Sequence, residues 1–174
     1  MTDNPYAPPN APVSDIDPSE VEYAGFWVRT GAALIDTVLI LAISFPLLFA
    51  LYGWAYFDSQ KSGFVAGTGD FIITWLLPAA ASIVFWLTRQ ATPGKMLLSA
   101  RVVDARTGNT LTVGQSIGRY LGYFISTLPF GLGLIWVAFD PRKQGWHDKL
   151  AGTVVIRSKR GRTQPVSFDK APGR

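Results

Sequence analysis

Arg29 and Asp36 are the ionisable side chains most closely tied to the apolar part of this chain. Their seven-residue spacing is close to two helical turns, so both face one side of a helix, about 10 Å apart along its axis. An ionisable group in a membrane segment is costly and normally faces a partner or a water-filled cavity. Asp36 is therefore a candidate cation or proton site whose proton affinity Arg29 adjusts. In the structural alternative, Arg29 anchors at lipid headgroups and Asp36 pairs with Arg119 or another base.

Asp140, His147 and Asp148 form a second polar group, just after the last apolar stretch. A histidine beside a carboxylate has the chemistry of a proton relay, because imidazole titrates near neutral pH. The alternative is a capped turn at the membrane interface, in which Asp140 caps the turn after the helix and the His-Asp pair bonds to local backbone groups. Together with Arg29 and Asp36, these residues form the candidate ion, proton or structural charge cluster.

The residue types give no support to metal, cofactor or enzyme chemistry. The chain has one histidine and no cysteine, which excludes multi-histidine and thiolate metal sites. Residues 92–95 (TPGK) lack the first half of a phosphate-binding loop. No serine lies in a nucleophile elbow. We therefore expect no metal, no cofactor and no enzymatic reaction.

Three apolar stretches must position these candidate residues. Of the 174 residues, enough for one domain, only 16% are charged, against about 25% in soluble domains. Residues 25–57 and 71–88 each provide enough apolar helix to cross a bilayer core, which needs about 20 residues. The third stretch, 120–139, is interrupted at residues 129–133 (PFGLG), where a helix would break. The composition and these stretches predict an all-α integral membrane protein.

A small β element is predicted between and after the apolar stretches. Residues 96–104 and 110–113 flank the turn residues 105–109, a pattern typical of a β-hairpin. A further strand at 153–156 is expected to pair with residues 100–104. Ahead of the membrane domain, the acidic, proline-rich segment 1–22 is expected to be a disordered tail.

The distribution of basic residues predicts how the chain sits in the membrane. Residues 89–119 carry five Lys or Arg, whereas the loop 58–70 carries Lys61 alone. The positive-inside rule then places the N-terminus and the β element in the cytoplasm. Residues 140–174 carry nine Lys or Arg, so they too belong inside. This favours two full transmembrane helices plus a broken, re-entrant helical hairpin at 120–139. The alternative is a kinked third span with an external C-terminus.

The basic C-terminal segment also indicates its partners. Clustered Lys and Arg beside a membrane favour anionic lipid headgroups. No aromatic and basic platform for nucleic acid accompanies them, so we expect no nucleic acid. A homo-oligomer or a membrane-protein partner is a further expectation, because so few helices would have to form any transport path.

Three motifs together resemble the RDD family of membrane proteins, which is named for one arginine and two aspartates. They are GFWVR through LID at 25–36, TPGKMLL through RVVD at 92–104, and FD through QGWHDKLAGT at 139–153. The resemblance covers residues 23–156 as a membrane domain and leaves 157–174 as a basic tail. It makes Arg29 and Asp36 the family's arginine and first aspartate, and Asp140, or alternatively Asp148, the second.

The resemblance implies a multi-pass protein of a bacterial-type inner membrane, without an established biochemical activity. Transport, including cation/proton exchange in some members, is suggested for the family. The alternative is a non-transport scaffold or assembly factor in which the arginine and aspartates are structural.

Overall fold

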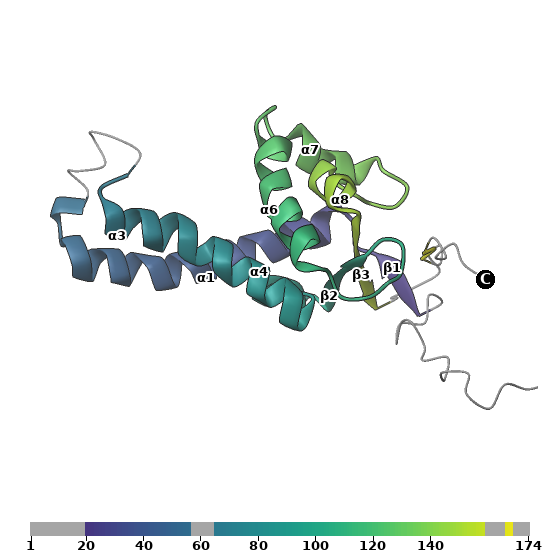
Figure 1. The fold of residues 1–174 in the computed structure, drawn as a ribbon, viewed down its shortest axis with the longest axis horizontal. Coiled ribbons are helices and arrows are strands. Elements are labelled where there is room, and N and C mark those ends of the chain that lie inside the picture. Colours follow the sequence, from purple (N-terminus) through teal and green to yellow (C-terminus); the bar gives the residue numbers. More distant parts are fainter. Residues whose placement is uncertain (1–19, 57–64, 159–165, 169–174) are drawn as a thin grey trace, which may run out of the picture.

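A computed structural model describes residues 20–56, 65–158 and 166–168 of the chain. Two long apolar helices lie side by side and extend away from a second region built from short helices and a small sheet (Figure 1). The first long helix is α1 (Phe26–Tyr52). The second is assembled from α3 (Thr68–Phe71), a π-helical turn and α4 (Leu77–Arg89). By length and composition both could cross a membrane.

The third apolar stretch is a bent pair of helices, as its Pro-Phe-Gly centre predicts. Helix α6 (Val113–Thr127) is followed by α7 (Leu132–Ile135) and a 3-10 turn, and the chain bends by 112° between them. Helix α6 begins seven residues before the predicted start at Tyr120. The Thr112 side chain accepts a hydrogen bond from the Gln115 backbone N–H and starts the helix there.

The predicted β-hairpin is wrong. Residues 93–97 form helix α5 (Pro93–Leu97), and only Ala100–Asp104 forms a strand, β2. Residues 110–112 do not pair, because the Asp104 carboxylate accepts hydrogen bonds from the backbone N–H groups of Arg106 and Thr107 and from the Gln115 side chain. These bonds turn the chain into the N-terminus of α6, so no second arm is available to β2.

The predicted pairing of residues 153–156 with 100–104 is confirmed. Strand β3 (Thr153–Ser158) runs antiparallel to β2, with Val102 opposite Val155. Strand β1 (Val21–Tyr23) pairs with the other edge of β3 and gives the order β1-β3-β2. Val21 and Glu22 belong to the segment that we expected to be disordered. Glu20 lies in a turn before β1, whereas residues 1–19 lie outside the described residues, as does most of the basic tail.

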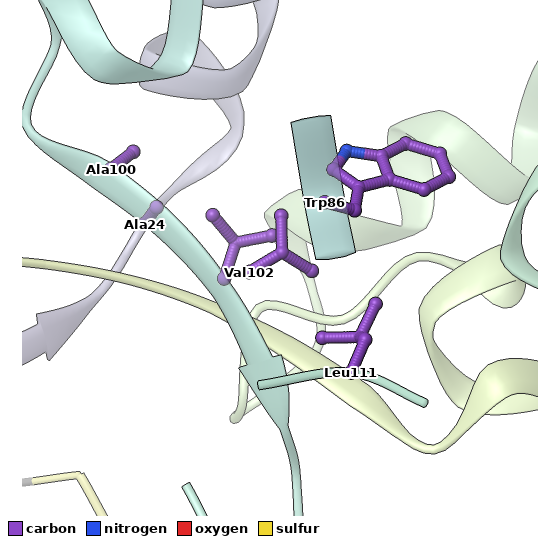
Figure 2. Close-up of a cluster of buried hydrophobic side chains, with 6 residues drawn as sticks. Ala24, Trp86, Ala100, Val102 and Leu111 are labelled. Carbon is purple, nitrogen blue, oxygen red and sulfur yellow. The ribbon is translucent and has the colours of Figure 1, made fainter. Parts of the chain in front are cut away.

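Both faces of the sheet are buried, which explains its run of valines. Val102 and Val155 face a cluster with Trp86 of α4 and Leu111 (Figure 2). The next residues along the strands, among them Val103, face the opposite cluster. This alternation follows the two-residue period of a strand. Trp86 thereby ties the end of a long helix to the sheet.

The sheet also fixes which chain segments share one end of the long helices. Strand β1 precedes α1, β2 follows α4, and β3 follows α8 (Trp146–Ala151). Their pairing keeps all three together. If α1 and α4 cross a membrane, a third complete crossing would put β3 on the far side from β1 and β2. Under that condition, α6 and α7 would have to enter and leave on one side, as in the predicted re-entrant hairpin.

Candidate functional site

A buried carboxylate, Asp148, joins three helices through two arginines. Arg29 on α1 donates from Nη1 to Asp148 Oδ2 at 2.5 Å. Arg119 on α6 donates from its own Nη1 to Asp148 Oδ1. The Gly145 backbone N–H adds a third hydrogen bond, at 2.9 Å to Oδ2. We call Arg29, Arg119 and Asp148 the arginine clamp.

Arg29 uses all three of its nitrogens as donors, whereas Nε and Nη2 of Arg119 have no hydrogen-bond partner among the described residues. Arg29 also donates to the backbone carbonyls of Ala24 and Lys143, and Arg119 donates to Thr153 Oγ1 at 2.6 Å. Burial by itself would raise the pKa of Asp148, but Arg119 and Arg29 hold it far below its usual range. Asp148 therefore stays ionised and is fully engaged, which is the behaviour of a structural carboxylate.

His147 packs against α6 and is neutral at physiological pH. Burial lowers the pKa of the imidazole to about 3, with Asp148 acting in the opposite direction. The ring stacks on Tyr123 with centroids 4.0 Å apart, and its Nδ1 lies 3.2 Å from Ser126 Oγ. A side chain at Gly122 would collide with the His147 backbone, so this close packing needs a glycine. With a pKa near 3, His147 does not exchange protons near neutral pH.

Asp36 holds the start of helix α5 against α1. Its Oδ2 accepts a hydrogen bond from Thr92 Oγ1 at 2.5 Å, and its Oδ1 accepts one from the Gly94 backbone N–H at 2.7 Å. A Cβ at Gly94 would lie 2.1 Å from the Ala32 carbonyl oxygen. The Thr-Pro-Gly sequence is thus explained: threonine and glycine bind Asp36, and proline at the first helical position needs no N–H partner.

Asp36 does not form the pair with Arg119 or another base that the structural alternative proposed, nor does it contact Arg29. Among the described residues no ion pair includes Asp36, and both Arg119 and Arg29 bind Asp148 instead. Asp140 is also separate from the clamp. Its carboxylate pairs with Lys149 at 2.5 Å and accepts from the backbone N–H groups of Arg142 and Gln144. Asp140 thus caps a local turn, as one interpretation of the sequence proposed.

Lys95 is the functional candidate that the sequence interpretation missed. It follows Gly94 directly, is buried, and its Nζ has one long hydrogen bond, 3.5 Å to Thr92 Oγ1. Burial lowers the pKa of the Lys95 amine, because the ammonium form is poorly solvated there. Residues 92–95 (TPGK) contain this lysine, but in the sequence they match only the second half of a phosphate-binding loop.

Lys95 and Asp36 line an open cleft of about 540 Å³. Its walls come from α1, α4 and α6, and the lining includes Ile40, Trp86 and Phe124. We call this the α1–α4–α6 cleft. Two charged side chains thus lie in a largely aromatic and aliphatic surrounding. Of the five residues predicted from the sequence, Arg29 meets Asp148, which lies next to His147. Asp36 lies in the cleft, and Asp140 lies apart.

Comparisons with known proteins follow the same boundaries. The RDD family model matches residues 23–152. The uncharacterized protein YxaI of Bacillus subtilis (strain 168) is 33% identical over 156 residues, which cover 76% of this chain and 96% of that protein. The uncharacterized membrane protein YteJ of the same strain is 32% identical over 140 residues, with 79% of this chain and 82% of YteJ covered. No solved structure gives a significant match.

Proposed function

The chain belongs to the RDD family. From this membership we propose that it is a transport-related membrane protein. The exchange of protons and cations would take place at Asp36 in the α1–α4–α6 cleft. The observation that carries the proposal is that Asp36 and Lys95 line one open cleft between apolar helices. By contrast, Asp148 in the arginine clamp is buried and already pairs with Arg29 and Arg119. Among the candidate carboxylates, Asp36 has only neutral hydrogen-bond donors and borders an accessible space.

Proton and cation exchange at Asp36 is chemically consistent with these contacts. A carboxylate held by a hydroxyl and an N–H can accept a proton or a monovalent cation without first breaking an ion pair. Lys95 lies in the same cleft and supplies a positive charge that disfavours a second cation nearby. An exchanger needs the proton and the cation to compete for one site, because binding of one ion must exclude the other.

Replacement of Asp36 by asparagine tests the transport proposal. In proteoliposomes, Asp36→Asn should reduce proton-coupled flux of a monovalent cation to the level of empty liposomes, because the amide cannot carry the charge. The thermal midpoint of unfolding should fall by only a few degrees, since an asparagine oxygen still accepts from Thr92 or Gly94. Asp140→Asn is the matched control, because Asp140 lies outside the cleft, and it should retain flux.

Two results would contradict the transport proposal. The first is a folded Asp36→Asn protein with undiminished flux. The second is wild-type protein that moves none of Li⁺, Na⁺ and K⁺ in exchange for protons, in liposomes where a known exchanger is active.

The second candidate function is a membrane scaffold or assembly factor. The observation that favours it is the arginine clamp, in which all three charged groups serve packing between α1, α6 and α8. Under this function Asp36 is likewise structural, through its bonds to Thr92 and Gly94. Asp36→Asn would then lower expression or detergent stability, and a membrane-protein partner or a second copy would co-purify with the wild type.

We further propose that the sheet lies in the cytoplasm and that the chain resides in a bacterial inner membrane, as the excess of basic residues near the sheet favours. Because the sequence contains no cysteine, single cysteines report orientation directly. Ala55→Cys and Ser158→Cys place an exposed thiol at opposite ends of the long helices. In intact spheroplasts an impermeant maleimide should label Ala55→Cys, and should label Ser158→Cys only after lysis. The reverse pattern would overturn the proposed orientation.

A further inference from the structure

We propose that the α1–α4–α6 cleft binds an anionic phospholipid, whose phosphate contacts Lys95 and the indole N–H of Trp86 and whose acyl chain lies along the apolar wall. This inference concerns the same cleft as the proposed function but does not depend on transport. It also differs from headgroup binding by the basic C-terminal segment, since the contacts are buried within the helical region.

Two residues that line the cleft carry hydrogen-bond donors with few or no acceptors. Trp86 is 2% exposed, and its Nε1 has no hydrogen-bond partner among the described residues. The Lys95 ammonium can donate three hydrogen bonds, yet makes one contact, at 3.5 Å. Asp36 does not fill this role: it accepts from Thr92 and Gly94, and among the described residues no hydrogen bond or ion pair joins it to Lys95 or Trp86. A buried donor without an acceptor costs free energy, so the missing partner is a group that offers acceptors.

The charges around the cleft specify that this acceptor is an anion. Arg29 and Arg119 both pair with Asp148, and His147 is neutral. Asp36 and Tyr123 line the cleft beside Lys95, yet among the described residues no carboxylate forms an ion pair with the Lys95 amine. The protonated form of Lys95 therefore has no anionic partner. Arg119 extends this field toward the cleft, because its guanidinium lies 5.3 Å from the centre of the Trp86 ring. A buried charge is stable only when it is paired, and a phosphate would complete the pairing.

The remaining walls of the cleft fit an acyl chain. Ile40, Phe124 and Leu128 line it and are apolar, and Leu128 is 84% exposed. Two of these residues belong to α1 and α6, which lie within the apolar, membrane-type part of the fold. This side of the cleft is therefore largely apolar. A volume of about 540 Å³ is within the range of small-molecule sites. A phospholipid presents both a phosphate and a hydrocarbon chain at such an opening.

Lipid binding to the full-length protein tests this inference. Delipidated protein in a neutral detergent is titrated with dioleoylphosphatidylglycerol, with dioleoylphosphatidylcholine and with inorganic phosphate, and bound species are counted by native mass spectrometry. Phosphatidylglycerol should bind at least about tenfold more tightly than phosphatidylcholine, and excess inorganic phosphate should not displace it. Lys95→Gln should bring the two lipid affinities together, whereas Arg106→Gln should leave the tenfold preference intact. Arg106 is the matched control because it loses the same charge, is exposed, and lies outside both the cleft and the basic C-terminal segment.

Trp86→Phe provides a second variant that keeps an aromatic ring and removes the N–H. It should weaken phosphatidylglycerol roughly fivefold, and it decides the question if Lys95→Gln does not fold. An unaltered preference in a folded Lys95→Gln protein would overturn the inference. Displacement of the lipid by inorganic phosphate at equal concentration would also overturn it, since the site would then recognise a free anion.

Discussion

Asp148→Ala should destabilise the protein by about 3–5 kcal/mol, because it leaves two guanidinium groups buried without a counter-charge. Asp148 is fully buried, and it binds Arg29, Arg119 and the Gly145 backbone N–H at once. Its loss removes the contact that joins α1, α6 and α8. The free energy of unfolding, measured by chemical denaturation in detergent with tryptophan fluorescence, should fall accordingly. Much of the protein should also fail to fold on expression.

Asp140→Ala is the matched control for this prediction. Asp140 pairs with Lys149, whose side chain is 46% exposed, so water can solvate the lysine once its partner is gone. The expected cost is about 1–2 kcal/mol, mainly from the lost caps of Arg142 and Gln144. Equal losses from the two substitutions would contradict a central role for Asp148.

A double-mutant cycle adds a sharper criterion. Arg29→Met should lower the free energy of unfolding less in the Asp148→Ala background than in the wild type.

Gly94→Ala should destabilise the protein by about 2–4 kcal/mol and abolish any function of the cleft. The added methyl group would lie 2.1 Å from the Ala32 carbonyl oxygen of α1 and 3.0 Å from Asp36 Cγ. The contact is with helix backbone, which cannot move aside as a side chain can, so α5 must separate from α1. That separation breaks the hydrogen bonds from Thr92 and Gly94 to Asp36 and displaces Lys95. Thermal unfolding and lipid affinity should both report the change.

Gly118→Ala is the control for Gly94→Ala. Gly118 lies within α6, and a Cβ there would meet nothing within 4 Å. Alanine is a better helix former than glycine by about 1 kcal/mol, so Gly118→Ala should be neutral or slightly stabilising. If both substitutions had the same effect, the close approach of α5 to α1 would not explain the loss at Gly94.

Several elements were predictable because a local pattern determines them. The helices that could cross a membrane follow from uncharged apolar runs, since any polar interruption would be costly in lipid. The break near residues 129–133 follows from proline and glycine, and the chain bends by 112° there. The pairing of β2 with β3 follows from adjacent valines, which lie on opposite faces of a strand and need burial on both.

Two other elements were not predictable, one because a side-chain interaction turned the chain and one because its partner strand is distant in the sequence. Residues 110–113 have the composition of a strand arm, yet Asp104 and Thr112 use their side chains to turn the chain into α6. Strand β1 is too short to show a period, and it exists because β3 offers a free edge with which Val21 and Tyr23 pair. In both cases the deciding partner lies in another element.

The sequence alone determined that Arg29, Asp36, Asp140, His147 and Asp148 are the charged and polar groups associated with apolar helices. It could not determine which of them meet. Only the tertiary structure decided that Arg29 and Arg119 share Asp148. It also decided that Asp36 binds the start of α5, and that Lys95 lines a cleft without forming an ion pair among the described residues. Spacing along one helix sets which side a residue faces, but the partner on that side comes from residues more than 50 positions away. Ion pairing and burial depend on that long-range packing, and no local pattern encodes it.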